Sequence, residues 1–491
     1  MFLPLPEAGM TSKQPNPIRE APPAAAPLVL SFPADLTTPV RAFLALTEPG
    51  QDAYLLESVT GGESQARFSF IGLDVTETFE VGTRAAIHRA DGVEQLPGDP
   101  LQALAAWAAE LTAVSAGVPV PFLGGAVGWA DFSAFALSEP VLAGCFPAAR
   151  APRLRFGRFA TGLVLDHLKQ LGYLYHFPAP GEPETAGAER LGRLRQRLEG
   201  ALPRRDKASL FLLTRGPDRT SFRRNFAAVQ EAILAGEAYQ IVISEPFEGT
   251  MEGDPFEVYR RLRRLNPSPY HFFVSLGGRQ LVGASPEMLV RVEGPEVVTV
   301  PIAGTRPRGG SQAEDARLAA ELQADPKELA EHAMLVDLAR NDLGRVCEHG
   351  SVTVPVRGQV EMFSHVMHMT SEVHGRLQDG LRPLDALWST FPAGTLSGAP
   401  KIRATQILSA LEGEDRGAYG GGVGILDRSG NLELAITIRT MEFESGRVRF
   451  RAGCGLVSDS VEASEWAEIH AKAGVLLAAL EGREPLCSEV E

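Results

Sequence analysis

Residues 420–480 read GGGVGILDRSGNLELAITIRTMEFESGRVRFRAGCGLVSDSVEASEWAEIHAKAGVLLAAL. Short polar turns divide this stretch into three predicted strands and one helix, at 420–427, 432–440, 447–455 and 460–480. In the middle strand an aliphatic face alternates with a face of small and polar residues that ends at Arg439. Successive strands followed by a helix, without βαβ alternation, indicate an α+β fold rather than a doubly wound parallel sheet.

The same pattern extends toward the N-terminus. Further strands are predicted at 51–58, 66–73, 77–82, 84–90, 271–278, 279–284, 287–294 and 297–304. Helices are predicted to begin at Asp99-Pro100, to cover 220–239 and to cover 326–342. We divide the chain into a flexible tail (1–27), an N-terminal domain (28–177), a linker (178–208), a second domain (209–482) and a C-terminal tail (483–491).

Composition excludes several classes of protein. The 491 residues carry 47 Lys and Arg against 61 Asp and Glu, a net charge of −14, with no basic cluster, so we expect no nucleic-acid partner. No apolar run approaches the roughly 18 residues that span a bilayer, so we expect no membrane association. The four cysteines lie far apart, and the N-terminus lacks the basic and apolar regions of a signal peptide. We therefore expect a cytoplasmic protein.

Acidic residues stand on two helices where a metal ion could bind. Glu331 falls between Leu335 and Leu338 on a helix that is apolar nearly all round and therefore predicted to be buried, so its carboxylate needs a partner. On the terminal helix, Glu468 shares a face with Glu465 and Lys472. Ion pairs with basic neighbours would explain both. The alternative is a Mg²⁺ site between the two helices, because Mg²⁺ prefers carboxylate oxygens and water.

Glycine-rich turns next to small hydroxyl or basic residues indicate a pocket for an anion. The turns PIAGTRPRG, FPAGTLSGAPK, AYGGGVG and RAGCG allow close approach of the backbone to a ligand. Arg439 would suit a carboxylate clamp. Neither the P-loop nor the Rossmann glycine pattern is present, so nucleotide binding has little support.

Six ordered segments together resemble one known family. They are VPIAGTRPRG, EHAMLVDLARNDLG, FPAGTLSGAPKIRA, AYGGGVG, LAITIRT and AGCGLVSDSVEASEWAEIHAKA, and they cover about 210–480. This part of the chain is similar to the chorismate-using enzymes, and most of all to the component I family of anthranilate synthases. The resemblance implies a two-domain α+β fold, an antiparallel-sheet and helix sandwich, with chorismate and Mg²⁺ bound in the second domain.

The resemblance also implies roles for individual residues. Implied Mg²⁺ ligands are Glu331 and Glu468, with Glu465 behind them. Implied substrate contacts are Gly304, Thr305, Tyr419, Arg439, Gly453, Cys454, Gly455 and Lys472. Implied catalytic residues are Glu287, His368, Thr395 and Gln240. Cys454 departs from the usual Gly-Ala-Gly. Glu287 would be a general acid, and His368 would assist proton movement or pyruvate loss; the alternative for His368 is a core histidine in a Met-rich strand.

Two positions distinguish reactions within the family. Ala303 stands where similar aminodeoxychorismate synthases carry a nucleophilic Lys, and without an amine a covalent Lys route cannot run. Gln240 stands where the enzymes that add water carry a Lys base. Both positions favour addition of ammonia to chorismate, with loss of pyruvate and formation of anthranilate. Component I of aminodeoxychorismate synthase, and a non-catalytic tryptophan-sensing subunit, are the alternatives.

The resemblance further implies a partner and an inhibitor. No nucleophilic Cys is placed for glutamine hydrolysis, so ammonia would come from a separate glutamine amidotransferase subunit, in a heterotetramer. L-Tryptophan would bind between the domains as a feedback inhibitor. The implied tryptophan residues are Glu57, Ser58, Pro269, Tyr270 and His271. His271 stands where a Met is often found.

Overall fold

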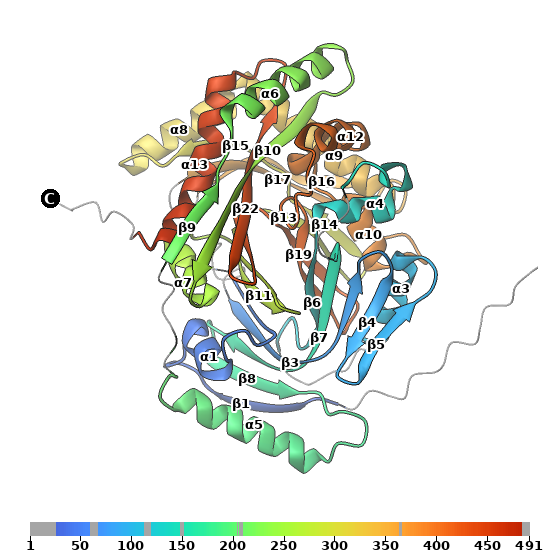
Figure 1. The fold of residues 1–491 in the computed structure, drawn as a ribbon, viewed down its shortest axis with the longest axis vertical. Coiled ribbons are helices and arrows are strands. Elements are labelled where there is room, and N and C mark those ends of the chain that lie inside the picture. Colours follow the sequence, from blue (N-terminus) through green and yellow to red (C-terminus); the bar gives the residue numbers. More distant parts are fainter. Residues whose placement is uncertain are drawn as a thin grey trace, which may run out of the picture.

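A computed structural model describes residues 26–58, 67–111, 119–147, 152–203, 205, 210–362 and 366–483 (Figure 1). The strands are β1 Leu28–Pro33, β2 Ala53–Glu57, β3 Phe68–Val81, β4 Ala85–Arg89, β5 Gly92–Leu96, β6 Gly125–Ala130, β7 Leu154–Asp166, β8 Leu171–His176, β9 Leu210–Arg215, β10 Gln240–Glu252, β11 Tyr270–Leu276, β12 Arg279–Ser285, β13 Met288–Glu293, β14 Glu296–Thr299, β15 Ile302–Pro307, β16 Thr353–Met362, β17 Val366–Arg376, β18 Gly398–Ala399, β19 Gly422–Asp427, β20 Leu432–Ile436, β21 Thr440–Glu444 and β22 Arg447–Leu456. The helices are α1 Pro39–Leu46, α3 Pro100–Ala109, α4 Phe135–Ser138, α5 Glu184–Glu199, α6 Arg219–Leu234, α7 Pro255–Leu265, α8 Gln312–Ala324, α9 Pro326–Gly344, α10 Pro383–Thr390, α11 Gly394–Ser397, α12 Lys401–Glu412 and α13 Glu462–Glu481.

The strands form two antiparallel sheets that are joined along one side. In the first sheet the order is β9–β10–β22–β21–β12–β11–β2. In the second sheet the order is β6–β19–β20–β13–β14–β17, and β15 and β16 also pair with β17. The two are joined because β2 pairs with β3, β3 with β7, and β7 with β6. This all-antiparallel arrangement with flanking helices confirms the predicted α+β class.

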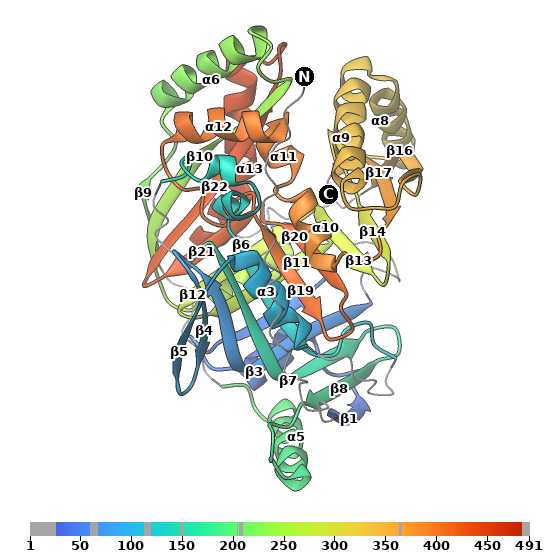
Figure 2. The ribbon, with the colours of Figure 1, turned by 90° about the vertical axis from the view of Figure 1, so that its right-hand side faces the viewer.

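Three cores separate the layers of the molecule. Between the two sheets lie aromatic and aliphatic residues such as Tyr54 and Phe272 of the first sheet and Trp129 and Val423 of the second. Helices α1, α6, α7, α12 and α13 cover the outer face of the first sheet, and α5 packs on β1, β8 and α1. Helices α3, α4, α9 and α10 cover the outer face of the second sheet. Figure 2 shows α6 and α12 on one side of the molecule and α8 and α9 on the other, beside β16 and β17.

The predicted linker and domain boundary coincide with a helix, not with a separation of two bodies. Helix α5 occupies most of 178–208 and packs on β8 and β1. The segments before and after it are hydrogen-bonded directly, because β2 pairs with β11 and β6 pairs with β19. The domain limits that we placed by composition stay a prediction. In the described part of the chain, no helix has both the length and the apolar character needed to cross a membrane.

Several predicted elements are corrected by the structure. Residues 68–73 and 77–81 of two predicted stretches (66–73 and 77–82) belong to one strand, β3, in which Asp74 has a φ of 57° and the pairing with β7 shifts register between Val75 and Glu77. The stretch 297–304 is two strands, β14 and β15, which pair with β17 at different places. Helix α9 begins at the expected Asp325 cap but is not buried all round: Leu329 is 42% exposed, and only one face packs on the second sheet.

Candidate active site

Two chain crossings between the sheets bring Glu287 and Arg439 to one corner. Glu287 lies between β12 of the first sheet and β13 of the second, and Arg439 lies between β20 of the second and β21 of the first. The amide of Ile436 donates to the carbonyl of Glu287 at 3.0 Å, and the amide of Ala284 donates to the carbonyl of Arg439 at 3.2 Å. Arg439 has a left-handed φ of 49°. The predicted strand 432–440 is therefore wrong beyond Ile436, because the chain turns there into the first sheet.

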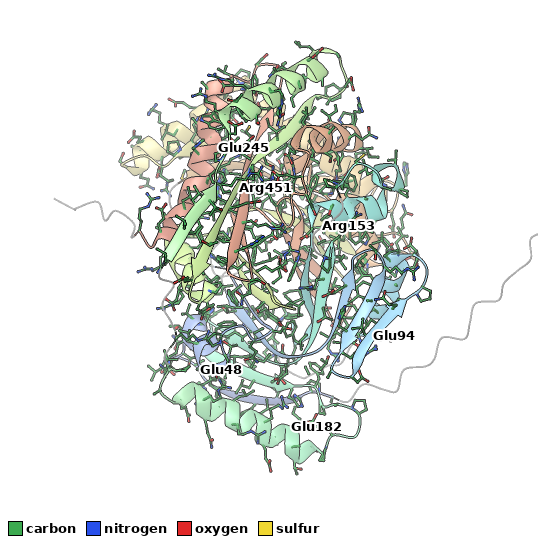
Figure 3. The ribbon with its side chains drawn as sticks, in the orientation of Figure 1. Glu48, Glu94, Arg153, Glu182, Glu245 and Arg451 are labelled. Atoms are coloured by element: carbon green, nitrogen blue, oxygen red, sulfur yellow. The ribbon has the colours of Figure 1, made fainter. Side chains whose placement is uncertain are left out.

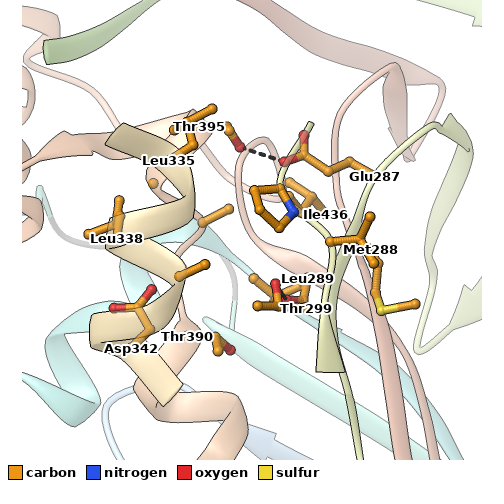
Figure 4. A pocket seen from close by; sticks show the side chains of 15 residues that line it. Glu287, Met288, Leu289, Thr299, Leu335, Leu338, Asp342, Thr390, Thr395 and Ile436 are labelled. Atoms are coloured by element: carbon orange, nitrogen blue, oxygen red, sulfur yellow. Dashed lines mark hydrogen bonds between the residues drawn. The ribbon is translucent and has the colours of Figure 1, made fainter. Parts of the chain in front are cut away.

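The carboxyl group of Glu287 is buried and held by one hydroxyl group. Thr395, on α11, donates its Oγ1 proton to Oε1 of Glu287 at 2.9 Å (Figure 4). Burial raises the pKa of Glu287 to about 7, although the Thr395 hydroxyl and the charges of Lys472 and Arg439 act in the opposite direction. A carboxyl group with a pKa near 7 is half protonated at neutral pH, so it can donate a proton there.

A small cavity of about 40 Å³ extends from Glu287 toward helix α9. Leu335 and Leu338 of α9, and Glu287, Met288 and Ile436 from the strands beside it, are among the residues that line it (Figure 4). At its far end, Lys401 donates to Asp342 and to the carbonyl of Thr390, each at 2.9 Å. In this structure that volume admits only a few molecules the size of water.

His368 is fixed by the bulge in β15. Gly304 has a φ of 68°, and a side chain there would meet Leu322 and Glu328 at 2.9 and 3.0 Å. Its carbonyl accepts a hydrogen bond from Nδ1 of His368 at 3.2 Å. Burial and the nearby charge of Arg439 lower the pKa of His368, so the imidazole is neutral with its proton on Nδ1. Thr305 pairs with His368 in the ladder, and its side chain lies outside the described residues.

The Gly453–Gly455 segment of β22 forms another wall. A Cβ on Gly453 would lie 2.7 Å from the Tyr419 hydroxyl, and one on Gly455 would lie 2.7 Å from Nε2 of Gln240. Cys454, between them, is fully buried in the core. The Gly453 carbonyl accepts from Nζ of Lys472 at 3.0 Å. Among the described residues, Oε1 of Gln240 is buried without a hydrogen-bond donor. A ligand N–H or O–H group would satisfy that acceptor.

The acidic residues of α9 and α13 face one another. Burial raises the pKa of Glu331 and so do the charges of Glu328, Glu465 and Glu468, against the effect of Lys327. The pKa of Glu465 is likewise raised by burial and by Glu468. Glu468 is paired with Lys472 at 2.6 Å, the ion pair that the spacing also predicted. Within the described ranges, no three His, Cys, Asp or Glu residues form a ready metal cluster. Glu331 and Glu468 as a repelling pair fit a cation that keeps most of its water.

The predicted site residues thus come together in one region. One set of residues linked by contacts or charges consists of Gly304, His368, Arg439, Glu287 and Thr395. The set continues with Lys472, Gly453, Tyr419, Glu468 and Glu331. Sequence reasoning missed four polar residues around them: Asn266, which accepts from Arg439 at 3.5 Å, Lys401, Glu412 and Arg416. The charged residues of EDRGAYGG, directly before the glycine turn, were the signal that could have identified Arg416.

The residues assigned to tryptophan lie elsewhere, on the β2–β11 pair. Glu57 is directly opposite His271. Its carboxylate accepts two hydrogen bonds from Arg263, at 3.0 and 3.1 Å, and one from the hydroxyl of Tyr259. Burial and the charge of Arg263 lower the pKa of His271 to about 3, so its ring is neutral. Ser58 and Pro269 flank this pair, and the hydroxyl of Tyr270 donates to Glu433 at 2.9 Å.

This corner between two antiparallel sheets, lined by a buried acid and a buried guanidinium group, is that of an enzyme acting on a small anionic substrate. The sequence model of chorismate binding enzymes matches residues 52–478. Component 1 of anthranilate synthase from Thermus thermophilus is 42% identical over 92% of this chain and 97% of that protein. The Streptomyces coelicolor protein of the same name is 41% identical over 93% of this chain and 89% of its own length. The crystal structure of anthranilate synthase component I from Streptococcus pneumoniae superimposes with a TM-score of 0.74 at 33% identity, covering 90% and 98% of the two chains. The chain belongs to the chorismate binding enzyme family, among the component I anthranilate synthases.

Proposed function

We propose that this chain converts chorismate and ammonia into anthranilate and pyruvate, with Mg²⁺ as cofactor, as the first committed step of tryptophan synthesis in the cytoplasm. The observation that carries the proposal is the corner where Glu287, Arg439 and His368 meet beside the glycines of β22. Ala303, next to the Gly304 bulge, offers no amine for a covalent intermediate. Ammonia itself is therefore the nucleophile, and aminodeoxychorismate chemistry is not favoured.

Substrate binding uses both charged and backbone groups. The guanidinium group of Arg439 binds one carboxylate of chorismate, and desolvation strengthens that ion pair. Lys472, the Tyr419 hydroxyl and the backbone of Gly304, Gly453 and Gly455 surround the rest of the substrate. Glu331 and Glu468 hold Mg²⁺, which supplies positive charge for the ring carboxylate.

The chain's own side chains then move protons. Ammonia adds at C2 of the ring as the C4 hydroxyl departs, and protonated Glu287 donates a proton to that leaving oxygen. Thr395 holds Glu287 in position. The Oε1 atom of Gln240 accepts a hydrogen bond from an N–H group of the incoming ammonia, and the ammonium group formed at C2 then loses its extra proton to solvent water. In the second step the C2 proton leaves, the enolpyruvyl group departs as pyruvate, and the ring becomes aromatic; neutral His368 assists this step.

A partner and an inhibitor complete the proposal. Glutamine-derived ammonia comes from a separate amidotransferase subunit, in a heterotetramer. L-Tryptophan binds at the β2–β11 pair, where Glu57, Ser58, Pro269, Tyr270 and His271 gather. What supports this is that the five residues, far apart in sequence, lie on two paired strands and the turn beside them.

Fluorescence of anthranilate tests the proposal directly. The purified chain is given chorismate, Mg²⁺ and a large excess of ammonium near neutral pH, with EDTA in a parallel sample. We expect anthranilate emission that EDTA abolishes and added Mg²⁺ restores. Formation of isochorismate or aminodeoxychorismate instead would overturn the assigned reaction, and turnover that resists EDTA would overturn the assigned cofactor. Tryptophan binding without turnover of chorismate would favour a sensing subunit.

A further inference from the structure

A buried ion pair outside the substrate-lining residues connects three separate walls of the site. Glu412, the last residue of α12, and Arg416 have side chains that are each only 2% exposed. Nε of Arg416 donates to one carboxylate oxygen of Glu412 at 2.8 Å, and Nη2 donates to the other at 2.7 Å. Burial alone would raise the pKa of Glu412, but Arg416, Arg451 and the Ser244 hydrogen bond keep that pKa below its ordinary value. The carboxyl group of Glu412 is therefore ionised.

The remaining hydrogen bonds of Arg416 go to the backbone of two site-bearing elements. Nη1 donates to the carbonyl of Leu396 at 2.7 Å, next to Thr395 on α11. Nη2 donates to the carbonyl of Val242 at 2.7 Å, and Val242 pairs with Gly455. The guanidinium group also lies 5.8 Å from the centre of the Tyr419 ring. One rigid planar group thus touches the Thr395 helix, the strand opposite Gly455, and Tyr419.

Glu412 binds the same edge of this strand two residues further along, at Ser244. Its Oε1 accepts from the amide of Ser244 at 2.8 Å and from the Ser244 hydroxyl at 2.9 Å. Ser244 pairs with Gly453, whose Cα lies close under the Tyr419 hydroxyl. Arg451, which is labelled in Figure 3, binds the Ser244 carbonyl and hydroxyl at 2.8 and 2.9 Å, so every polar group of Ser244 has a partner. Small shifts of β10 would therefore displace Gly453 and Gly455.

We propose that Glu412 and Arg416 are positioning residues, which hold Thr395, Tyr419 and the Gly453–Gly455 segment in the relative places that chorismate binding and turnover require. The inference rests on the proposed function of the site. Neither side chain lines the substrate region, so both act through the groups that they hold. Through its hydrogen bonds and its contact with Tyr419, the ion pair connects β10, α11 and the glycine turn, which lie far apart in the sequence.

Replacement of Arg416 by Lys separates charge from geometry. Lysine keeps the positive charge beside Glu412 but cannot bind Glu412, Leu396 and Val242 together, because it lacks the planar fork. We expect KM for chorismate to rise and kcat to fall, with kcat/KM reduced about 100-fold, since displacements near 1 Å have effects of that size. Glu412→Gln keeps an acceptor for Ser244, so its loss should be smaller, about tenfold.

The matched control is Arg205→Lys. Arg205 is also buried, pairs with Asp254 and donates to the carbonyl of Thr47, but it lies between α1 and α7. We expect this variant to lose thermal stability while its kcat and KM stay within about twofold of the parent. All variants are assayed with ammonium at least 15 °C below their own melting temperatures.

A binding measurement makes the test independent of turnover. Without ammonium, chorismate plus Mg²⁺ should raise the melting temperature of the parent and of Arg205→Lys, and should raise that of Arg416→Lys much less. If Arg416→Lys loses no more activity and no more chorismate-induced stabilisation than Arg205→Lys, the pair is only structural and the inference is overturned. If the parent itself forms no anthranilate while chorismate still stabilises it, the proposed function fails and the positioning role is decided by the binding result alone.

Discussion

The chemistry of the site depends on a carboxyl group that is neutral where most are charged. Glu287 is 8% exposed, and its pKa is raised from 4.5 to about 7 by burial. Because this pKa is higher in the folded chain than in the unfolded chain, the contribution of Glu287 to the free energy of unfolding is complete below pH 4.5. That contribution is lost as the pH rises through about 7. Activity should depend on pH in the same direction, because Glu287 loses over that interval the proton that the leaving hydroxyl needs.

Activity should therefore fall with rising pH, at a position that Thr395 controls. The Thr395 hydroxyl stabilises the carboxylate form, so Thr395→Val should raise the pKa of Glu287 further and move the alkaline limb of kcat/KM to higher pH. The maximum rate should fall about tenfold because the acid is less well oriented. The measurement is kcat/KM against pH with free ammonia held constant. A limb that stays in place, or moves to lower pH, would contradict Glu287 as the acid, and Glu287→Gln should have no such limb.

The carboxylates on α9 and α13 should respond to the metal concentration. Glu468→Gln removes one of two proposed ligands, so the Mg²⁺ concentration for half-maximal activity should rise at least about 10- to 100-fold, the effect of losing even a hydrogen-bond partner of a metal ligand. Glu462→Gln is the control, because Glu462 lies on the same helix but pairs with Arg219 and Arg223. Titration of activity with Mg²⁺ measures both. Equal Mg²⁺ requirements in the two variants would count against Glu468 as a ligand.

At the scale of elements, periodicity predicted what local sequence determines. The Asp325 cap with Pro326 placed α9 correctly, and alternation placed β11, β12 and β22 within a few residues. Periodicity placed the end of the strand wrongly at Arg439. The chain turns out of β20 there because β12 pairs with β21, and that contact is distant in sequence. Periodicity failed again on α9, where the pattern indicates only which residues are apolar, not which face another element covers.

The site residues divide in the same way. Those within recognisable motifs, such as Glu287 and His368, could be named from the sequence by family resemblance. Glu412 and Arg416 could not, because their role depends on which carbonyl groups the fold places around a guanidinium group. A charged pair four residues apart is usually a solvated helix pair, and only the structure shows this one to be buried.

The β2–β11 pair is the element on which the inhibitor prediction depends. Ser58 follows the last residue of β2, beside Glu57, whose carboxylate is already committed to Arg263 and Tyr259. A phenyl group in Ser58→Phe would fill space that a bound amino acid needs, so tryptophan inhibition should weaken at least tenfold with little change in the uninhibited rate. Inhibition curves with L-tryptophan measure this. Parent-like inhibition would remove Ser58 from the site, and a lost basal rate would show that β2 also supports catalysis.

At the scale of the whole molecule, buried charges connect the N-terminal and C-terminal parts of the chain. Arg279, on β12, donates two 3.0 Å hydrogen bonds to Asp131 and further bonds to Glu442 on β21; the three side chains are 2–5% exposed. Glu442 in turn accepts from the amide of Ala418 at 2.9 Å, in the turn that carries Tyr419. The same network therefore joins the two sheets and supports one wall of the site.

Replacing Arg279, the centre of this network, should destabilise the N-terminal and C-terminal parts of the chain together. Arg279→Met leaves two carboxylates buried with fewer partners, which should lower the free energy of unfolding by about 3–5 kcal/mol. Arg89→Met is the control, because Arg89 forms half-exposed ion pairs with Glu77 and Glu94 and should contribute less than about 1 kcal/mol.

Urea unfolding followed by circular dichroism and by tryptophan fluorescence measures the loss and tests cooperativity, since Trp107 and Trp129 lie in the N-terminal part and Trp388 and Trp466 in the C-terminal part. The strand pairs β2–β11 and β6–β19 predict coincident transitions for the parent. Separate transitions, with Arg279→Met affecting only one, would mean that residues 28–177 fold as an independent domain despite those pairings.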